Sequence, residues 1–143
     1  MMDKQDEALK LLKDIRHITR LIEITSQEIE ASYTRLTNTT VKPKQIDVQV
    51  SLPSDPMADG VIELVEYQKQ LDSYRKELIE KRAIFYDVLG RISAEAQVYL
   101  TLRYLQNKSV EEIGDDQGYG YRRSWDKLHD AETEFIEQYL NIA

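Results

Sequence analysis

The chain has 143 residues, which suits one domain or a small globular module attached to an elongated one. Its 26 acidic and 19 basic residues give a net charge of −7 and a pI near 4.9, so the chain as a whole is not expected to attract a polyanion such as DNA. The absence of cysteine excludes disulfides, thiolate zinc sites and cysteine nucleophiles together.

Only 5 glycines and 3 prolines interrupt the chain, so long helices are the first expectation. The charged start "MMDKQDEALK" has no apolar run long enough for a signal peptide. No later segment approaches the roughly 20 apolar residues of a membrane span. These features predict a cytoplasmic protein with no membrane partner and an all-α fold.

A heptad pattern runs through the first part of the chain and predicts a helix over residues 3–36. Its apolar and small residues alternate three and four apart, as the a and d positions of a coiled coil do. They are Ala8, Leu11, Ile15, Ile18, Ile22, Thr25, Ile29, Ser32 and Leu36.

The block "TNTTVKPKQIDVQVSLPSDP" breaks this pattern with β-branched residues and prolines. We interpret residues 37–54 as a structured loop, in which Val48, Val50 and Leu52 alternate as in a short strand. Asp55 and Pro56 then have the residue types of a helix N-cap and first helical position.

A second heptad pattern follows and predicts a helix over residues 55–91, with Gly60 as its weak point. Its positions are Met57, Leu64, Tyr67, Leu71, Tyr74, Leu78, Lys81, Phe85, Val88 and Ile92. Two helices of similar length favour a long antiparallel coiled-coil hairpin over residues 1–92. One hairpin leaves apolar edges, so we expect a homodimer or another small symmetric oligomer.

Polar residues interrupt both heptad patterns at Thr25, Ser32 and Lys81. Such positions commonly fix the register and the choice of partner. The alternative is a lysine that reaches solvent and two small residues that the core tolerates.

Residues 93–143 show the start and stop signals of shorter helices. Ser93 has the residue type of an N-cap for a helix with an inner stripe of Val98, Leu102 and Leu105, ending near Asn107 and Lys108. Ser109 and Glu112 then form an S-x-x-E capping box.

The helix that starts at this capping box is short. Ile113 is expected to point inward, and Gly118 is placed where a helix ends in the left-handed conformation.

The next helix is expected to begin at Gly120 or Tyr121. Its predicted inner face consists of Trp125, Leu128, Ala131, Phe135 and Ile142, which leaves Arg122, Arg123, Asp126 and Lys127 on the outer face. A capped short helix, a glycine turn and a second helix are typical of a helix-turn-helix, whose second helix enters the major groove. We therefore predict a C-terminal helix-turn-helix DNA-binding module over residues 93–143.

The segment "VYLTLRYLQNKSVEEIGDDQGYGYRRSWDKLHDAE" resembles the promoter-reading C-terminal module of bacterial sigma factors. It is also similar to small regulators from prophages of Gram-positive bacteria, the ArpU and RinA type of late-transcription activators. This resemblance implies a sigma-like phage or prophage regulator that works with bacterial RNA polymerase. The sequence departs from the pattern at Gln117 and Ser124, where apolar residues are usual, and Trp125 is expected to take the core role of Ser124.

The resemblance implies that Arg122, Arg123, Asp126 and Lys127 lie at the DNA, with Ser109 donating to a phosphate. Arginine suits this role because its guanidinium can bind both acceptors of a guanine edge. The alternative for each residue is an ordinary solvated charge. His129 is expected to be a surface residue.

The sequence thus favours a sequence-specific transcription regulator that binds double-stranded DNA. The alternative is an oligomeric packaging or interaction protein, such as a phage small terminase subunit. An enzyme is not expected, because the chain has no phosphate-binding glycine loop and its histidines, His17 and His129, lack metal-ligand spacing. No cofactor, metal or catalytic residue is predicted.

Overall fold

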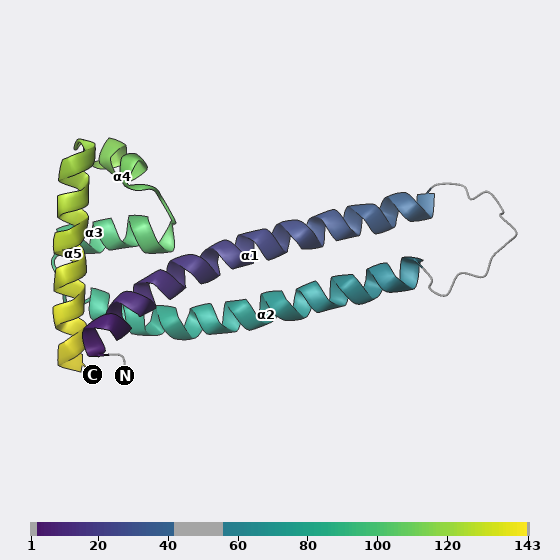
Figure 1. Ribbon diagram of the computed structural model, residues 1–143, viewed down its shortest axis with the longest axis horizontal. Helices are drawn as coiled ribbons and strands as arrows, with labels where there is room; N and C mark the ends of the chain where they lie inside the picture. The colour runs from purple at the N-terminus through teal and green to yellow at the C-terminus, as the bar shows by residue number, and fades with distance from the viewer. Residues whose placement is uncertain (1–2, 42–55, 143) are drawn as a thin grey trace, which may run out of the picture. The chain divides into compact units, whose positions relative to one another are not determined.

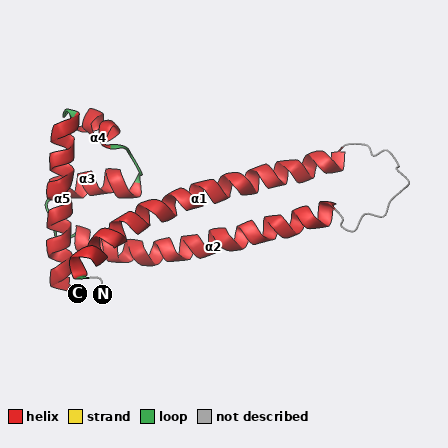
Figure 2. Ribbon diagram, in the orientation of Figure 1, coloured by secondary structure: helices red, strands yellow, loops and turns green. Residues whose placement is uncertain are grey.

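The computed structural model describes residues 3–41 and 56–142, which are helical apart from short turns and contain no strand (Figure 2). The predicted all-α class is confirmed. The helices are α1 (Lys4–Val41), α2 (Pro56–Leu89), α3 (Ala94–Leu100), the π-helical turn η1 (Thr101–Leu105), α4 (Val110–Gln117) and α5 (Tyr121–Ile142). None of the helices in these two ranges is long and apolar enough to cross a membrane.

The chain divides into two compact units. One comprises Leu21–Arg75, and the other comprises Met1–Arg20 together with Lys76–Ala143. Each long helix therefore contributes to both units. The three C-terminal helices share a unit with the beginning of α1 and the end of α2, whereas the sequence pattern predicts a boundary at residue 92.

Helix α1 begins because Asp3 caps it: the Asp3 carboxylate accepts a hydrogen bond of 2.9 Å from the backbone N–H of Asp6. The helix continues to Val41, so the prediction that residues 37–41 belong to a loop is wrong. The Thr37 hydroxyl donates to the Tyr33 carbonyl at 2.9 Å, so this polar group is satisfied within the helix. The strand predicted at Val48, Val50 and Leu52 and the N-cap predicted at Asp55 lie outside the described residues.

In the Leu21–Arg75 unit, the second half of α1 packs along the first half of α2. The Arg35 guanidinium lies 3.8 Å from the Glu63 carboxylate, and a Cβ on Gly60 would lie 2.6 Å from Leu36 Cδ2. Leu36 follows Arg35 in α1, but its neighbour Gly60 precedes Glu63 in α2. These two segments are therefore antiparallel.

The polar heptad positions of this unit are buried, as predicted. Thr25 is 6% exposed and Ser32 is 3% exposed, so both are buried at least as deeply as the apolar heptad residue Leu71 at 8%. The Ser32 hydroxyl accepts a hydrogen bond of 3.0 Å from Arg35, which satisfies a polar group that burial would otherwise leave at a cost.

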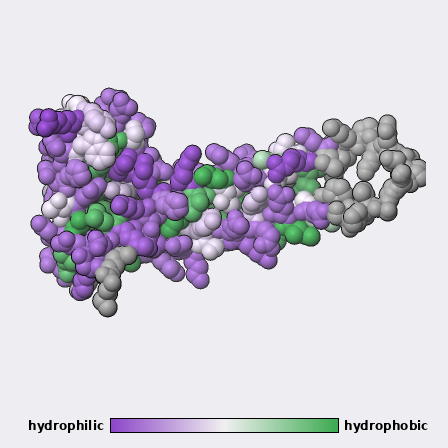
Figure 3. Space-filling model, viewed as in Figure 1, coloured by the Kyte–Doolittle hydropathy of each residue, from purple (hydrophilic) through white to green (hydrophobic). Residues whose placement is uncertain are grey.

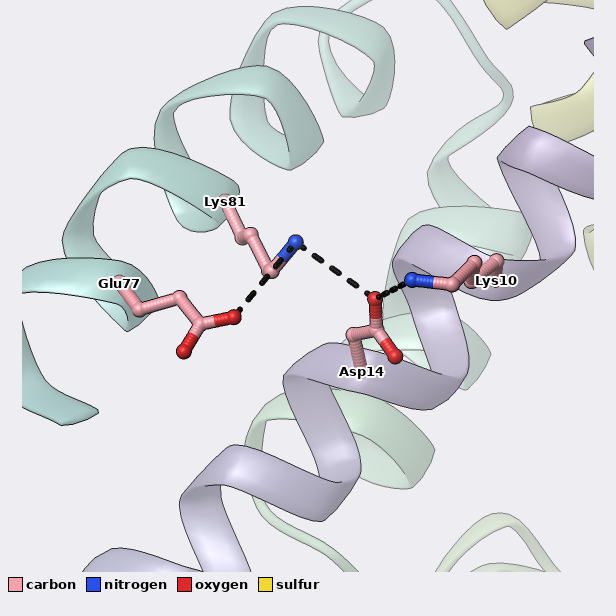
Figure 4. A network of polar contacts seen from close by, with 4 residues as sticks. All are labelled: Lys10, Asp14, Glu77 and Lys81. Carbon is pink, nitrogen blue, oxygen red and sulfur yellow. Dashed lines mark hydrogen bonds and ion pairs between the residues drawn. The ribbon is translucent and has the colours of Figure 1, made fainter.

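In the other unit, a polar network joins the beginning of α1 to the end of α2 (Figure 4). Asp14 accepts from Lys10 at 2.9 Å and lies 3.5 Å from the Lys81 ammonium, which is also 3.9 Å from Glu77. The hydrogen bond to Asp14 raises the pKa of Lys10 above its ordinary value. Lys81, the polar heptad position of α2, is therefore satisfied by a carboxylate on the facing helix.

Helices α3 and η1 bury a different face from the predicted one. Val98 is 41% exposed, whereas Tyr99 and Leu100 are buried at 1% and 0%. The α-helix widens to a π-helix at Thr101–Leu105, where the Gln106 N–H reaches back five residues to the Thr101 carbonyl. Of the predicted stripe, Leu102 is buried as expected, whereas the prediction for Val98 is wrong.

The core of this unit forms where α2, α3 and α4 pack on α5. Phe85 of α2 and Phe135 of α5 are fully buried, and their ring centroids lie 5.6 Å apart. Figure 1 shows α3 and α4 beside α5. Helix α5 is thus held along one side, which leaves its opposite side exposed.

Two hydrogen-bonded anchors fix α5 to the rest of this unit. Ser93 caps α3 by accepting from the Ala96 N–H, and it donates through its hydroxyl to Glu134 at 2.9 Å. The Tyr104 hydroxyl donates to Glu132 at 2.7 Å. Burial, together with this bond, raises the pKa of Tyr104 far above its ordinary value, so the phenol stays protonated and keeps donating.

Candidate nucleic-acid interface

Helix α4 begins at the predicted capping box. The Ser109 hydroxyl accepts from the Glu112 N–H at 3.1 Å, and the Ser109 N–H donates to the Glu112 carboxylate at 3.1 Å. The hydrogen bonds from Ser109 hold the pKa of Glu112 below its ordinary value. Ser109 is thus engaged with Glu112 at the start of α4.

Two glycines determine how α4 meets α5, one at the turn between the helices and one within α4. Gly118 ends α4 with φ of 78°, the predicted left-handed conformation, and its N–H bonds to the Gly114 carbonyl. A Cβ on Gly114 would lie 2.7 Å from both the Ser124 hydroxyl and the Tyr119 carbonyl oxygen. Gly114 therefore lets the two helices approach closely.

Ser124 occupies the core position of α5 that the sequence pattern predicts for Trp125. It is fully buried at 0% exposure, and its hydroxyl donates to the Gly120 carbonyl at 2.9 Å. A small residue fits here because it faces Gly114, and its polar atom is satisfied within its own helix. The prediction that Trp125 takes the core role is wrong.

Trp125 instead lies half-buried on one flank of α5, between two other rings. Its ring centroid is 6.3 Å from that of Tyr121 and 5.7 Å from that of His129, and the Arg103 guanidinium lies 5.9 Å above it. His129 is exposed, as predicted. Ile142, predicted on the inner face, is 38% exposed.

The opposite flank of α5 holds Arg123 and Lys127 around one aromatic ring. The Arg123 guanidinium lies 4.7 Å from the Tyr119 centroid and the Lys127 ammonium lies 5.3 Å from it. Lys127 also donates to Glu95 of α3, and this hydrogen bond raises the pKa of Lys127. Its charge is thus committed within the protein, whereas Arg123 remains exposed.

Between the two flanks lies the face directly opposite the buried Ser124 and Leu128. Arg122 and Asp126 lie on this face, one turn apart, and both are exposed. Neither makes a hydrogen bond or ion pair with any part of the chain that the structure describes. The two side chains are therefore free for an external ligand.

The charge on α5 changes sign along the helix. Arg122 and Arg123 occupy the first turn, where the helix N-terminus adds a partial positive charge. The carboxylates follow further along, at Asp126, Asp130, Glu132, Glu134 and Glu137. An anion is thus attracted to the start of α5 and repelled further on.

Hydrophilic residues cover most of the described surface in the view of Figure 3, and apolar residues form small separate patches.

The structure brings four of the five predicted site residues together on α5, and it places Ser109 at the start of the neighbouring helix. Sequence reasoning missed Tyr119 as a partner of Arg123, although their spacing of four residues was visible. It also missed Glu95, whose contact with Lys127 spans 32 positions along the chain and leaves no local signal.

Among the described residues, no group of three or more His, Cys, Asp or Glu side chains is arranged to hold a metal ion. No protein-family model matches the chain, and no curated protein or solved structure is significantly similar to it.

Proposed function

We propose that this protein is a sequence-specific transcription regulator that binds double-stranded DNA, with α4 and α5 as a helix-turn-helix and α5 as the reading helix. The observation that carries this proposal is the exposure of Arg122 and Arg123 in the first turn of α5, directly after the glycine turn. In helix-turn-helix proteins the N-terminal residues of the second helix contact base edges.

The helix faces give these arginines different roles. A helix that lies in the major groove presents its outermost face to the base edges and its flanks to the phosphates on either side. Arg122 lies on the outermost face and is assigned to a base. Arg123 lies on a flank and is assigned to a phosphate, and Ser109 at the start of α4 is assigned to a second phosphate.

Only a few cationic side chains lie on this surface, so its affinity for DNA is low. Few neutralised phosphates give weak binding per protomer and a shallow dependence on salt. We assign the remaining affinity to a second copy, joined through an antiparallel coiled-coil hairpin of α1 and α2, or to bacterial RNA polymerase. The resemblance to ArpU and RinA activators supports a phage or prophage late-gene activator.

The test is selection of bound duplexes from a random pool, followed by gel-shift affinity on the selected site at two salt concentrations. The Arg122→Ala, Arg123→Ala double variant should lose at least the roughly 1–3 kcal/mol of one base contact, with a smaller salt slope. The matched control is Arg75→Ala, Lys76→Ala, an exposed basic pair on α2 with the same change in charge. If both folded double variants bind the site as the wild type does, α5 does not read DNA.

A further inference from the structure

Asp126 is the residue of the exposed α5 face that a DNA-binding role leaves unexplained. It lies one turn after Arg122 on the side opposite the buried core, and it has no hydrogen bond or ion pair with the described part of the chain. By contrast, the neighbouring Lys127 is paired with Glu95. A free carboxylate on a surface that faces phosphates costs affinity for every duplex, because like charges repel.

Such a carboxylate is useful in the groove only where a base donates a hydrogen bond to it. Resting on the DNA-binding function above, we propose that Asp126 determines specificity by accepting a hydrogen bond from the N4 amino group of a cytosine. A duplex without that donor gains no hydrogen bond, and its phosphates are only repelled by the Asp126 carboxylate. Asp126 therefore gives specificity by weakening binding to other sequences.

Cytosine fits this role better than adenine because of what surrounds the amino group. Both bases present an amino donor in the major groove. Adenine places its N7 acceptor beside that donor, so a carboxylate there faces a second electron-rich atom. Cytosine presents the donor without an adjacent acceptor on the same base, and Asp and Glu are the side chains that accept from it.

The spacing of Arg122 and Asp126 predicts how their bases are placed. Four residues advance an α-helix by about 6 Å, which is close to two base steps of roughly 3.4 Å. With guanine as the base that arginine binds through two hydrogen bonds, the selected duplex should hold a guanine and a cytosine about two steps apart in the groove.

The experiment compares Asp126→Ala with Asp130→Ala on the selected duplex and on the same duplex with the cytosine replaced by pyrimidin-2-one, which lacks the amino group. Asp130 is the matched control, because it is an exposed carboxylate one turn further along the same helix. The wild type and Asp130→Ala should lose about tenfold to a hundredfold in affinity on the altered duplex. Asp126→Ala should bind both duplexes alike, with higher affinity than wild type for unrelated DNA.

A different result would overturn the proposal. If Asp126→Ala and Asp130→Ala strengthen binding to all duplexes equally, and the variants still prefer cytosine, Asp126 is only a repulsive surface charge. Wild-type protein that binds the two duplexes equally also refutes the cytosine contact, and this comparison needs no substitution that could disturb folding. Selection that enriches no duplex at all refutes the DNA-binding function itself, and this proposal falls with it.

Discussion

Gly114 and Ser124 hold α4 and α5 closer together than any larger side chains would permit. A methyl group on Gly114 would lie 2.7 Å from the Ser124 hydroxyl oxygen and 2.7 Å from the Tyr119 carbonyl oxygen. The second of these atoms is backbone and cannot swing away. The angle at which α5 presents Arg122 and Asp126 therefore depends on the absence of a side chain at position 114.

Gly114→Ala should lower the free energy of unfolding. Forcing a methyl group into a packed contact costs about 1–3 kcal/mol, and a backbone oxygen at 2.7 Å favours the upper part of that range, which exceeds the ~1 kcal/mol that alanine gains over glycine within a helix. Chemical denaturation followed by circular dichroism measures the difference. Gly90→Ala is the control, because its Cβ would meet only the Tyr86 and Asp87 carbonyls at 3.7 and 3.8 Å; an equal loss in both variants would contradict the close-contact argument.

Glu112→Gln should destabilise the protein at neutral pH and much less in acid. Hydrogen bonds from Ser109 lower the pKa of Glu112 in the folded state below its ordinary value of 4.5, so the unfolded chain binds the proton more tightly. The stabilisation is present above the unfolded pKa and is lost as the pH falls through the folded pKa.

The measurement for Glu112→Gln is the free energy of unfolding of the wild type and the variant from pH 7 down to pH 3. Glu111→Gln removes the same charge from the same helical turn, but Glu111 has no hydrogen bond with Ser109. A gap between wild type and Glu112→Gln that does not narrow in acid would show that the Ser109 bonds do not depend on the carboxylate charge.

Tyr119→Leu should weaken binding to the selected duplex, whereas Tyr119→Phe should not. The Tyr119 ring lies 4.7 Å from the Arg123 guanidinium and restricts where that cation points before DNA arrives. An exposed cation–π contact contributes about 0.5–1 kcal/mol, which corresponds to a twofold to fivefold loss in gel-shift affinity. On an Arg123→Ala background the two Tyr119 variants should bind equally, and a persisting difference would assign Tyr119 another role.

Sedimentation at tens of micromolar should show a homodimer or another small symmetric oligomer. Within the Leu21–Arg75 unit, Val61, Ile62 and Val65 of α2 are 47%, 61% and 41% exposed, so one copy leaves apolar surface in water. A monomer at this concentration would remove the avidity that the DNA-binding proposal uses. A ring of eight or more copies would favour the packaging alternative.

The caps and the glycine stop of the shorter helices were predictable from sequence because short-range chemistry decides them, whereas the end of α1 was not. The cap at Ser93, the reciprocal bonds of Ser109 and Glu112 and the left-handed Gly118 all formed as expected. Each involves residues at most three positions apart or a single backbone angle. The heptad positions of α1 were predictable for a similar reason, because a regular helix repeats one geometry along its length.

The face of α5 was harder to predict because the partner helix decides it. Hydrophobicity favours Trp125 over Ser124 as a core residue, yet only a small side chain fits against Gly114. The pairing of Lys127 with Glu95 likewise depends on how α3 packs on α5. Periodicity within one segment contains no information about either contact.

The π-helical turn at Thr101–Leu105 holds one residue more than an α-helical turn would, so the segments before and after it follow different phases. Deleting one position within this turn should convert it to an α-helical turn and keep the buried faces on either side in place, whereas a deletion within α3 should rotate the residues before it relative to those after it by about 100°. An alignment of this segment with an uninterrupted helix consequently needs a one-residue gap between Leu100 and Gln106, and an ungapped alignment would pair buried positions with exposed ones.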